Sequence, residues 1–570
     1  MSTEVPAGGG VLARPALPAS VEIYDTTLRD GSQQEGISLT VEDKLRVAQQ
    51  IDHLGVAYIE GGWPGANPKD GEFFARARDE LKLEHAVLAA FGSTRRAGAA
   101  AAGDETLGQL LRAATDTVCI VAKASDLHVT EALRTTLAEG VAMVRDSVAL
   151  LVGEGRQVFL DAEHFFDGFR RDPAFSLEVL AAAEEAGASA LVLCDTNGGA
   201  LPHEVEEIVA TVRAATRAVI GVHFHNDSGC AVANSLAAVR VGATQVQGCV
   251  NGYGERAGNA DLCVAIPDLT LKMGISTVPA EKLPLVTPTA RHIAEIVNLT
   301  LDPQKPYVGT AAFAHKAGLH TSAIVRRADA YEHVPPDSVG NGTRVVVSEL
   351  AGRSTLAMKA AELGIDLDAE ATGRVLDALK RLEHAGYHFE VADGSLELLM
   401  RAASGGGPEE LASFFTVESF RVVTDWRQLD HPVPDPERLV HGWGEEGELT
   451  TEATVKVHVG GDRVVETAEG NGPVNALDSA LRKAIGRYFP ELAALHLTDY
   501  RVRVLDTGKG TGAVTRVLLD TADEEGSFST IGVSENVIEA SWQALVDSIV
   551  FGLLRAGGVR GGASDTLGAR

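Results

Sequence analysis

The chain has 570 residues, of which 45% are apolar, 23% are charged and 5% are aromatic. At about 100 to 200 residues per domain, this length indicates several domains. The 50 basic and 79 acidic residues give 50 − 79 = −29, a net charge that repels nucleic-acid phosphates and anionic membrane surfaces. We therefore expect neither a nucleic-acid partner nor a membrane partner.

The ends of the chain and its cysteines indicate where the protein works. No run of 18 apolar residues and no signal-peptide pattern occurs, and the five cysteines show neither C-x-x-C spacing nor the density of a disulfide scaffold. These features predict a cytoplasmic protein with reduced thiols. Gly, Pro and Ala dominate residues 1–20 and 557–570, so we expect disordered tails there.

From residue 21 to residue 275, short apolar runs alternate with longer amphipathic segments. The first such helix is expected over residues 40–54, with Thr40 as N-cap and Gly55 as its stop. Eight buried strands separated by helices indicate a parallel sheet and favour an α/β fold, the TIM (β/α)8 barrel. An open doubly wound sheet is the alternative. The predicted strands are VEIYDTT (21–27), VAYIEGG (56–62), HAVLAAF (85–91), DTVCIVA (116–122), RQVFLDAEHF (156–165), ASALVLCDT (188–196), AVIGVHFHN (218–226) and ATQVQGCVNG (243–252).

The pattern changes after the barrel. Residues 276–430 are predicted to form mostly helical linker subdomains, and residues 431–556 an α+β regulatory domain. In the latter, EATVKVHV (452–459) alternates strictly, as a half-buried strand does. Strands followed by a helix occur twice, which predicts a duplicated module. Its two glycine-bearing helix starts, 470–473 and 532–534, could present backbone N–H groups to a small anion, or could be ordinary capped turns.

Polar side chains gather at the predicted carboxyl ends of the barrel strands, which converge on one mouth. His223 and His225 are two residues apart on a strand, so both point to the same face. Asp30 follows the first strand, and Asn259 adds an amide oxygen. This ligand set, without a thiolate, suits Mg, Mn, Zn or Co. Structural histidines that bind no ion are the alternative.

Two further residues at this mouth are candidates for binding substrate. Arg29, beside Asp30, offers a permanent cation that can stabilise an oxyanion. The alternative is a salt bridge, for example with Glu163. The hydroxyl of Thr196 could hold a substrate carboxylate, or it could cap the next helix.

Four motifs follow one another at the predicted strand ends: YDTTLRDGSQQEG (24–36), CDTNGG (194–199), HFHND (223–227) and NGYGERAGNADL (251–262). Together they resemble the metal-dependent enzymes that condense acyl-CoA with 2-oxoacids, namely the 2-isopropylmalate, homocitrate and citramalate synthases, whose barrels are of the DRE-TIM metallolyase type. The family's linker motif and allosteric domain are similar to HKAGLH (315–320), GNGPVNALDSALR (470–482) and GVSENVIEASWQAL (532–545). The (R)-citramalate synthase branch is the one most similar to IEGGWPGANPKD (59–70) and LDAEHFFDGF (160–169).

The resemblance implies an acyltransferase that joins acetyl-CoA and pyruvate, hydrolyses the thioester and releases (R)-citramalate and CoA for isoleucine biosynthesis. It also implies feedback by an amino acid, expected to be isoleucine, at the C-terminal domain, and a homodimer or larger homo-oligomer. A 2-isopropylmalate synthase acting on 2-oxoisovalerate is the main alternative. A lyase running the same chemistry backwards and a non-enzymatic metal or amino-acid sensor are further ones.

The resemblance also assigns roles to residues. The divalent metal ion is expected on Asp30, His223, His225 and Asn259. Arg29 is expected to neutralise the oxyanion, Thr196 to hold the oxoacid carboxylate and Glu163 to orient groups near the thioester. The residues expected to transfer protons, from the partner subunit of a dimer, are His320 and Tyr331. The candidate cations for the CoA phosphates, or else solvated surface charges, are Lys123, Arg95 and Arg96.

Overall fold

The computed structural model describes residues 17–316, 327–347, 352–404, 411, 413–428, 447–505, 507–524 and 526–557. Most of both predicted tails lies outside these ranges. The chain divides into two compact units. The first comprises residues 1–313 and 332–343, and the second comprises residues 314–331 and 344–570.

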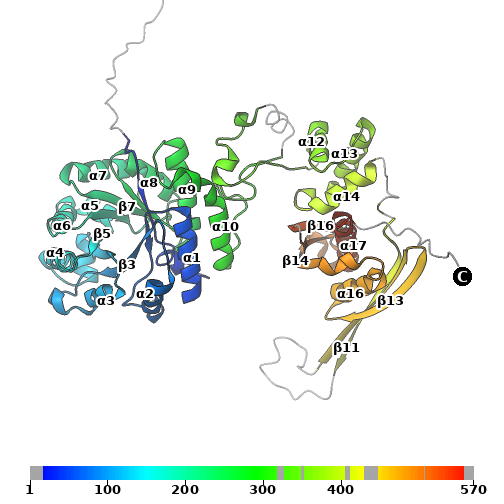
Figure 1. Cartoon of the computed structure of the whole chain (residues 1–570), viewed down its shortest axis with the longest axis horizontal. Coiled ribbons are helices and arrows are strands. Elements are labelled where there is room, and N and C mark those ends of the chain that lie inside the picture. Colours follow the sequence, from blue (N-terminus) through cyan, green and yellow to red (C-terminus); the bar gives the residue numbers. More distant parts are fainter. Residues whose placement is uncertain are drawn as a thin grey trace, which may run out of the picture. The chain divides into compact units, whose positions relative to one another are not determined.

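The first unit contains a closed barrel of eight parallel strands that pair in chain order (Figure 1). The last strand pairs with the first, from Glu22 opposite Gln245 to Asp25 opposite Gly248. This closure confirms the predicted TIM barrel and excludes the open sheet. The strands are β1 (Glu22–Asp25), β2 (Tyr58–Glu60), β3 (Val87–Ser93), β4 (Thr117–Lys123), β5 (Gln157–Glu163), β6 (Ala190–Asp195), β7 (Val219–Phe224) and β8 (Gln245–Gly248).

Helices follow the strands and bury their apolar faces against them. The first, α1, begins after Thr40, which forms a capping box with Asp43, and ends at Gly55 in the left-handed conformation (φ 91°), as its sequence predicts. The helices of this unit are α1 (Val41–Leu54), α2 (Pro68–Glu80), α3 (Glu105–Ala113), α4 (Leu137–Gly153), α5 (Phe165–Arg171), α6 (Pro173–Glu185), α7 (Pro202–Ala215), α8 (Ala231–Arg240), α9 (Leu262–Pro267) and α10 (Val286–Ile296).

Inside the barrel, an aromatic layer lies below a polar one. Phe159 packs against Tyr24 and Tyr58, with ring centroids 5.9 and 5.1 Å apart. Because side chains alternate along a strand, the next inward residue of β5 toward the mouth is Asp161 and the one after it is Glu163. The aromatic layer therefore closes the floor of a polar pocket at the carboxyl ends of the strands.

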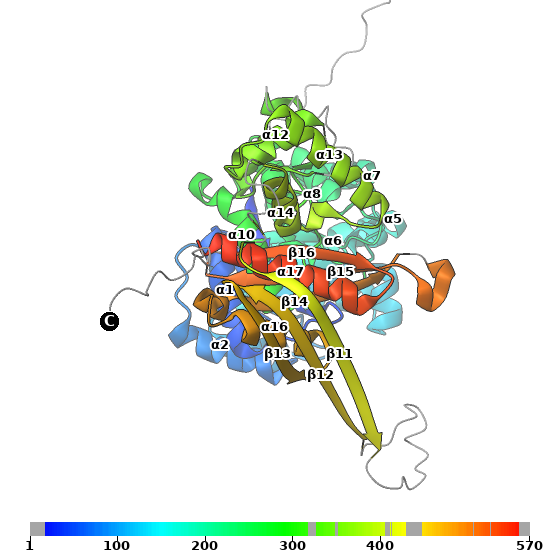
Figure 2. The ribbon, with the colours of Figure 1, turned by 90° about the vertical axis from the view of Figure 1, so that its right-hand side faces the viewer.

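The second unit contains small helices and two three-stranded antiparallel sheets (Figure 2). Helix α16 packs on β12 and β13, and α17 packs on β15 and β16, so the predicted duplication of strands and helix is present. The elements are β9 (Ala314–His315), β10 (Arg344–Val345), α12 (Arg353–Glu362), α13 (Ala369–His384), α14 (Asp393–Ala403), β11 (Thr416–Gln428), β12 (Gly447–Val459), β13 (Asp462–Gly470), α16 (Pro473–Ile485), β14 (His496–Val504), β15 (Thr515–Asp523), β16 (Gly526–Ser534) and α17 (Val537–Arg555).

The strand β12 confirms the alternation in the sequence, because Ala453, Val455, Val457 and Val459 are buried in the core. Its partner β11 precedes residue 431, so the sheet extends to earlier residues than the predicted start of the regulatory domain. Helix α17 is long and apolar enough to span a membrane, but 61% of its apolar 18-residue window is buried within the protein, as in a core helix. All five cysteines are free thiols.

Candidate active site

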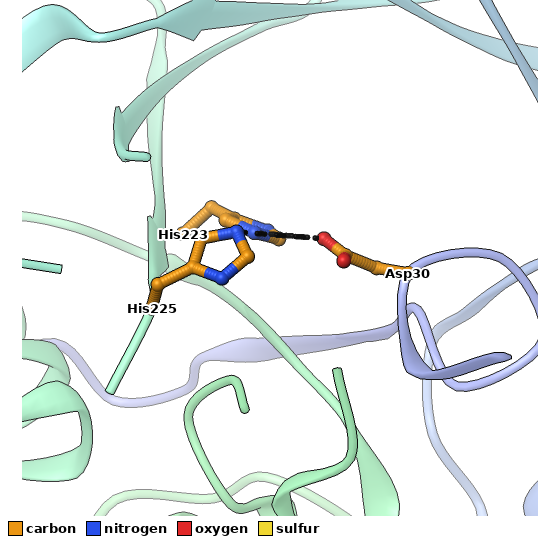
Figure 3. Close-up of side chains that lie close together, drawn as sticks. All are labelled: Asp30, His223 and His225. Atoms are coloured by element: carbon orange, nitrogen blue, oxygen red, sulfur yellow. Dashed lines mark ion pairs between the residues drawn. The ribbon is translucent and has the colours of Figure 1, made fainter. Parts of the chain in front are cut away.

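Three predicted ligands meet at the mouth of the barrel (Figure 3). Asp30 lies in the turn after β1, and His223 and His225 come from the end of β7. The Oδ2 atom of Asp30 lies 3.2 Å from Nε2 of His223 and 3.8 Å from Nε2 of His225. One ligand atom from each residue lies within 4.8 Å of the other two, and all three side chains are buried. This geometry fits a shared divalent cation.

Asn259 completes the donor set beside His225, with which it forms an isolated backbone bridge. Its Nδ2 donates to the carbonyl oxygen of Tyr253 at 3.0 Å. Its Oδ1 is buried and has no hydrogen-bond partner among the described residues, and the same holds for Nδ1 of His225. Buried polar atoms without partners are costly, so these two atoms fit a site that binds a cation.

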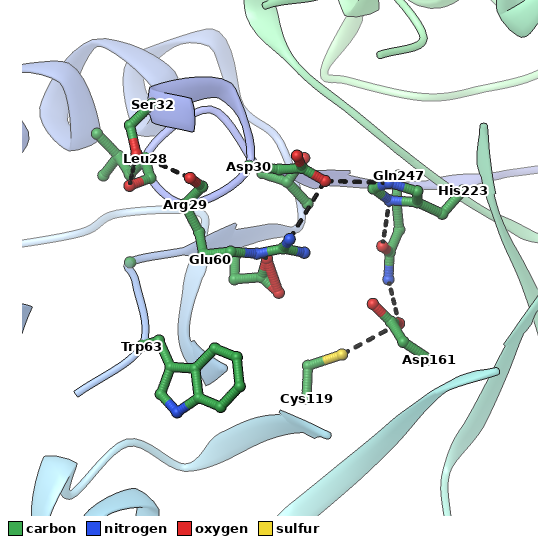
Figure 4. Close-up of polar contacts among 12 residues, drawn as sticks. Leu28, Arg29, Asp30, Ser32, Glu60, Trp63, Cys119, Asp161, His223 and Gln247 are labelled. Atoms are coloured by element: carbon green, nitrogen blue, oxygen red, sulfur yellow. Dashed lines mark hydrogen bonds and ion pairs between the residues drawn. The ribbon is translucent and has the colours of Figure 1, made fainter. Parts of the chain in front are cut away.

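Arg29 is held by three neighbours at the same mouth, two of which, Glu60 and Asp30, are labelled in Figure 4. Its Nε donates to Oε1 of Glu60 at 2.7 Å, its Nη1 lies 3.2 Å from Oδ2 of Asp30, and its guanidinium carbon lies 3.9 Å above the ring of Phe91. The salt bridge named as the alternative for Arg29 is present, but its partners are Glu60 and Asp30; Glu163, the partner given as an example, pairs with Lys123 instead. Glu60 is nearer because β2 adjoins β1 in the barrel.

Burial and charge oppose each other in this cluster. Burial raises the pKa of Asp30, but Arg29 and the hydrogen bond from His223 outweigh it and hold that pKa well below its usual range. Burial lowers the pKa of His223, yet the bond to Asp30 leaves it raised. Burial and His223 lower the pKa of His225 to about 4. The site therefore holds the ionised carboxylate of Asp30 beside the imidazole of His225, which stays neutral at pH 7.

Thr196 lies across the mouth and does not cap the next helix, because α7 begins at Pro202 with Leu201 as its N-cap. Its Oγ1 instead accepts the backbone N–H of His164 at 2.9 Å. Because that hydroxyl acts as an acceptor there, its own proton can be donated to a ligand. His164 has φ 56° and stacks on His128, with ring centroids 3.6 Å apart.

These groups surround a cavity of about 240 Å³, and one of its lining residues, Asp161, was not singled out from the sequence. Asp161 is a buried acid on β5, two residues before Glu163. The signal that could have found it is the alternation of inward residues, which marks Asp161 once Glu163 is placed at the mouth. The cavity is lined by Arg29, Asp30, Gln33, Trp63, Phe91, Val121, Asp161, Glu163, Cys194, Thr196, His223, His225, Glu255 and Arg256.

The remaining predicted residues have different surroundings. Arg95 is buried and paired with Glu139 and Asp146, so it is not a solvated surface charge, and its contact with CoA stays a prediction. Arg96 is exposed. Tyr331 is 46% exposed in the second unit, and His320 lies outside the described residues.

Comparison with known proteins matches three family models along the chain. They are HMGL-like over residues 20–280, homocitrate synthase post-HMGL domain-like over 307–386, and LeuA allosteric (dimerisation) domain over 390–552. The (R)-citramalate synthase of Streptomyces coelicolor is 53% identical over 96% of this chain and 99% of its own length. The chain belongs to the (R)-citramalate synthase family.

Five (R)-citramalate synthases are 42–53% identical to this chain, and a relative named as a 2-isopropylmalate synthase is less similar. The (R)-citramalate synthase of Synechocystis sp. is 50% identical over 94% of this chain and 96% of its own length. A probable 2-isopropylmalate synthase of Methanopyrus kandleri is 33% identical over 94% of this chain and 98% of its own length. The higher identities agree with the branch expected from the sequence.

Proposed function

We propose that this protein condenses pyruvate with acetyl-CoA and hydrolyses the thioester to give (R)-citramalate and CoA, for isoleucine biosynthesis. The observation that carries the proposal is the cluster of Asp30, His223 and His225 beside Arg29, in a chain that belongs to the (R)-citramalate synthase family.

Asp30, His223 and His225 would hold a divalent cation, with Asn259 Oδ1 as a fourth ligand. A bound cation of this kind acts as a Lewis acid that polarises a ketone. Mg, Mn, Zn and Co all accept this mixture of imidazole and oxygen donors.

The chain's own residues then supply the remaining interactions. The guanidinium of Arg29 neutralises the alkoxide that forms as the acetyl-CoA enolate attacks the keto carbon. The Thr196 hydroxyl donates to the oxoacid carboxylate, which fixes the face that is attacked. Glu163, which lines the cavity and pairs with Lys123, orients the thioester. His320 and Tyr331 of a partner subunit are proposed to transfer protons to and from the acetyl group.

Release of free CoA thiol from acetyl-CoA with a panel of 2-oxoacids tests this function. Pyruvate should give the fastest turnover, and chelation of divalent metal should abolish it. Replacing His223 with Ala should remove turnover, whereas His203→Ala, on α7, should not. Faster turnover with 2-oxoisovalerate would instead assign a 2-isopropylmalate synthase, and turnover that survives chelation would contradict the metal-dependent mechanism.

The C-terminal module is proposed as the site of feedback by isoleucine and of dimerisation. Its match to the LeuA allosteric (dimerisation) domain over residues 390–552 supports both roles. A cytoplasmic location agrees with the buried state of α17, the one described helix with the length and composition of a membrane span. Thiol release measured with isoleucine and with leucine tests the effector, and sedimentation of the full chain tests the dimer.

A further inference from the structure

Gln247 connects a proposed metal ligand to a buried acid below it (Figure 4). Its Oε1 lies 3.0 Å from Nδ1 of His223, and its Nε2 donates to Oδ1 of Asp161 at 3.2 Å. Gln247 is fully buried and Asp161 is 3% exposed, so water does not replace either contact. The same Oδ1 of Asp161 also accepts the thiol of Cys119 at 3.1 Å.

The chemistry of these groups fixes the direction of each hydrogen bond. Oδ1 of Asp161 already accepts the Cys119 thiol and so acts as an acceptor, which requires the amide of Gln247 to point its NH₂ group at it. The amide oxygen then faces His223, and because an oxygen of this kind can only accept, Nδ1 of His223 must carry the proton. Nε2, which donates to Asp30 at 3.2 Å, is then the nitrogen that can give up its proton and offer its lone pair to a cation, because Nδ1 keeps its own proton.

We propose that Gln247 and Asp161 are positioning residues that hold His223 in the Nδ1–H tautomer, so that Nε2 is free to bind the divalent cation. The inference rests on the metal site proposed above and deepens it. Partners of this kind orient the rings of metal-binding histidines and tune their affinity. Here the partner is an amide whose own orientation is set by a carboxylate one layer deeper in the barrel.

Cys119 strengthens this arrangement from the other side of Asp161. Burial raises the pKa of its thiol well above the usual value, so the sulfur keeps its proton and remains a donor. Two donors therefore converge on one oxygen of Asp161. A flipped amide at Gln247 would place its oxygen against that carboxylate, which is repulsive, and its NH₂ group against His223.

The same strand offers a matched control. Gln245 also points into the barrel and is fully buried, two residues before Gln247. Its Nε2 lies 3.4 Å from Oε2 of Glu22, one layer further from the mouth. Replacing either glutamine with Leu removes the same amide from the same strand, but only the change at Gln247 removes a contact to His223.

The first test measures Co²⁺ binding to the metal-free full-length protein by calorimetry, together with the visible absorption of bound Co²⁺. Gln247→Leu should weaken binding by about 10- to 100-fold, the usual effect of losing such a partner, and should change the absorption bands. Gln245→Leu should bind like the wild type. Equal affinity and equal spectra in Gln247→Leu and the wild type would overturn the proposal.

A second test exchanges the two groups and remains informative if Gln247→Leu does not fold. In the double variant Asp161→Asn/Gln247→Glu, the new amide can donate to the new carboxylate, which can also accept from His223. The single variants should each weaken Co²⁺ binding, and the double variant should bind within a few-fold of the wild type. A double variant as weak as the worse single variant would contradict the proposed pairing.

The outcomes separate this inference from the proposed function. A wild-type protein that binds no divalent cation would remove the metal site and the positioning role together. A wild type that binds Co²⁺ and releases CoA with pyruvate, with Gln247→Leu binding Co²⁺ equally well, would refute the positioning role alone.

Discussion

At the scale of single residues, Arg29 is held by groups of three different kinds. Glu60 accepts from its Nε, Asp30 lies beside Nη1, and Phe91 lies under its plane. Only a planar cation with several donors can satisfy all three at once, and an ammonium group on a flexible stem cannot. The arrangement holds the charge in place before substrate binds.

Arg29→Lys should therefore lower kcat for thiol release by roughly 10²–10³-fold, the usual effect of losing a preorganised oxyanion donor. Because lysine keeps the positive charge, the decrease in kcat measures how much the fixed position of the guanidinium contributes. Arg46→Lys, at an exposed position of α1, should leave kcat unchanged. A lysine variant with normal kcat would show that the position of this cation does not limit the reaction.

Trp63 borders the same cavity and packs edge-on against Phe91, with ring centroids 5.4 Å apart. Trp63→Ala should enlarge the space beside the oxoacid side chain. Because one methylene in a pocket is worth about 1–3 kcal/mol, the preference for pyruvate over 2-oxobutyrate in kcat/KM should fall by about tenfold or more. Trp63→Phe should keep most of the preference. An unchanged ratio in Trp63→Ala would show that another wall excludes larger acids.

The sequence predicts some of these residues and not others for a physical reason. His223 and His225, two residues apart on a strand, and Asp30, just after a strand, can be recognised from their spacing in the sequence. Gln247 and Asp161 occupy strand interiors and resemble ordinary barrel-filling positions. Their contact depends on the register of β5 and β8, which closure of the barrel brings together across 86 residues of chain.

At the scale of elements, the end of β1 is fastened to β8 by a buried acid. Oδ1 and Oδ2 of Asp25 accept the backbone N–H and the hydroxyl of Thr27, each at 2.9 Å. Thr27 Oγ1 in turn accepts the N–H of Val250 at 2.9 Å. This turn places Asp30, whose N–H donates to the carbonyl of Thr26 at 2.9 Å.

Burial raises the pKa of Asp25 from 3.8 to about 7, which predicts a pH-dependent cost to stability. Between pH 4 and pH 7 the folded state keeps a proton that the unfolded state has lost, so the free energy of unfolding falls as pH rises through this range. Asp25→Asn removes the titration. We therefore expect the free energy of unfolding of Asp25→Asn, measured in urea, minus that of the wild type, to increase by up to about 4 kcal/mol between pH 4 and pH 7.5. A difference that stays constant with pH would contradict the raised pKa.

Prediction of elements succeeds where the pattern is strong. Barrel strands buried on both faces and helices with caps stand out in the sequence. The strands β11 and β13 were not predicted. In β13 only Val464 is buried. Strands whose neighbours provide little burial lack the alternation that marks β12.

At the scale of the whole molecule, a regulatory module shares one chain with the barrel. An effector acts on turnover only if its binding differs between two states of the protein, and the resulting coupling is reciprocal. Isoleucine that weakens pyruvate binding must itself be bound more weakly, by the same factor, when pyruvate is present.

Calorimetry on the full-length protein should therefore give a higher isoleucine Kd in the presence of saturating pyruvate and metal. The increase should equal the factor by which isoleucine raises the pyruvate Kd, typically about 5- to 150-fold. Leucine serves as the control amino acid. An isoleucine Kd that is the same with and without pyruvate and metal would show that isoleucine does not change the affinity for pyruvate, which would contradict the coupling.

The claim on which the account depends is that Asp30, His223 and His225 bind one divalent cation. Anomalous diffraction from crystals grown with Mn²⁺ and pyruvate tests it most directly. The account predicts one strong peak enclosed by the Asp30 carboxylate and the two imidazoles, with pyruvate density against it and Arg29 alongside. Mn²⁺ bound elsewhere, with the two imidazoles still paired to Asp30, would contradict it.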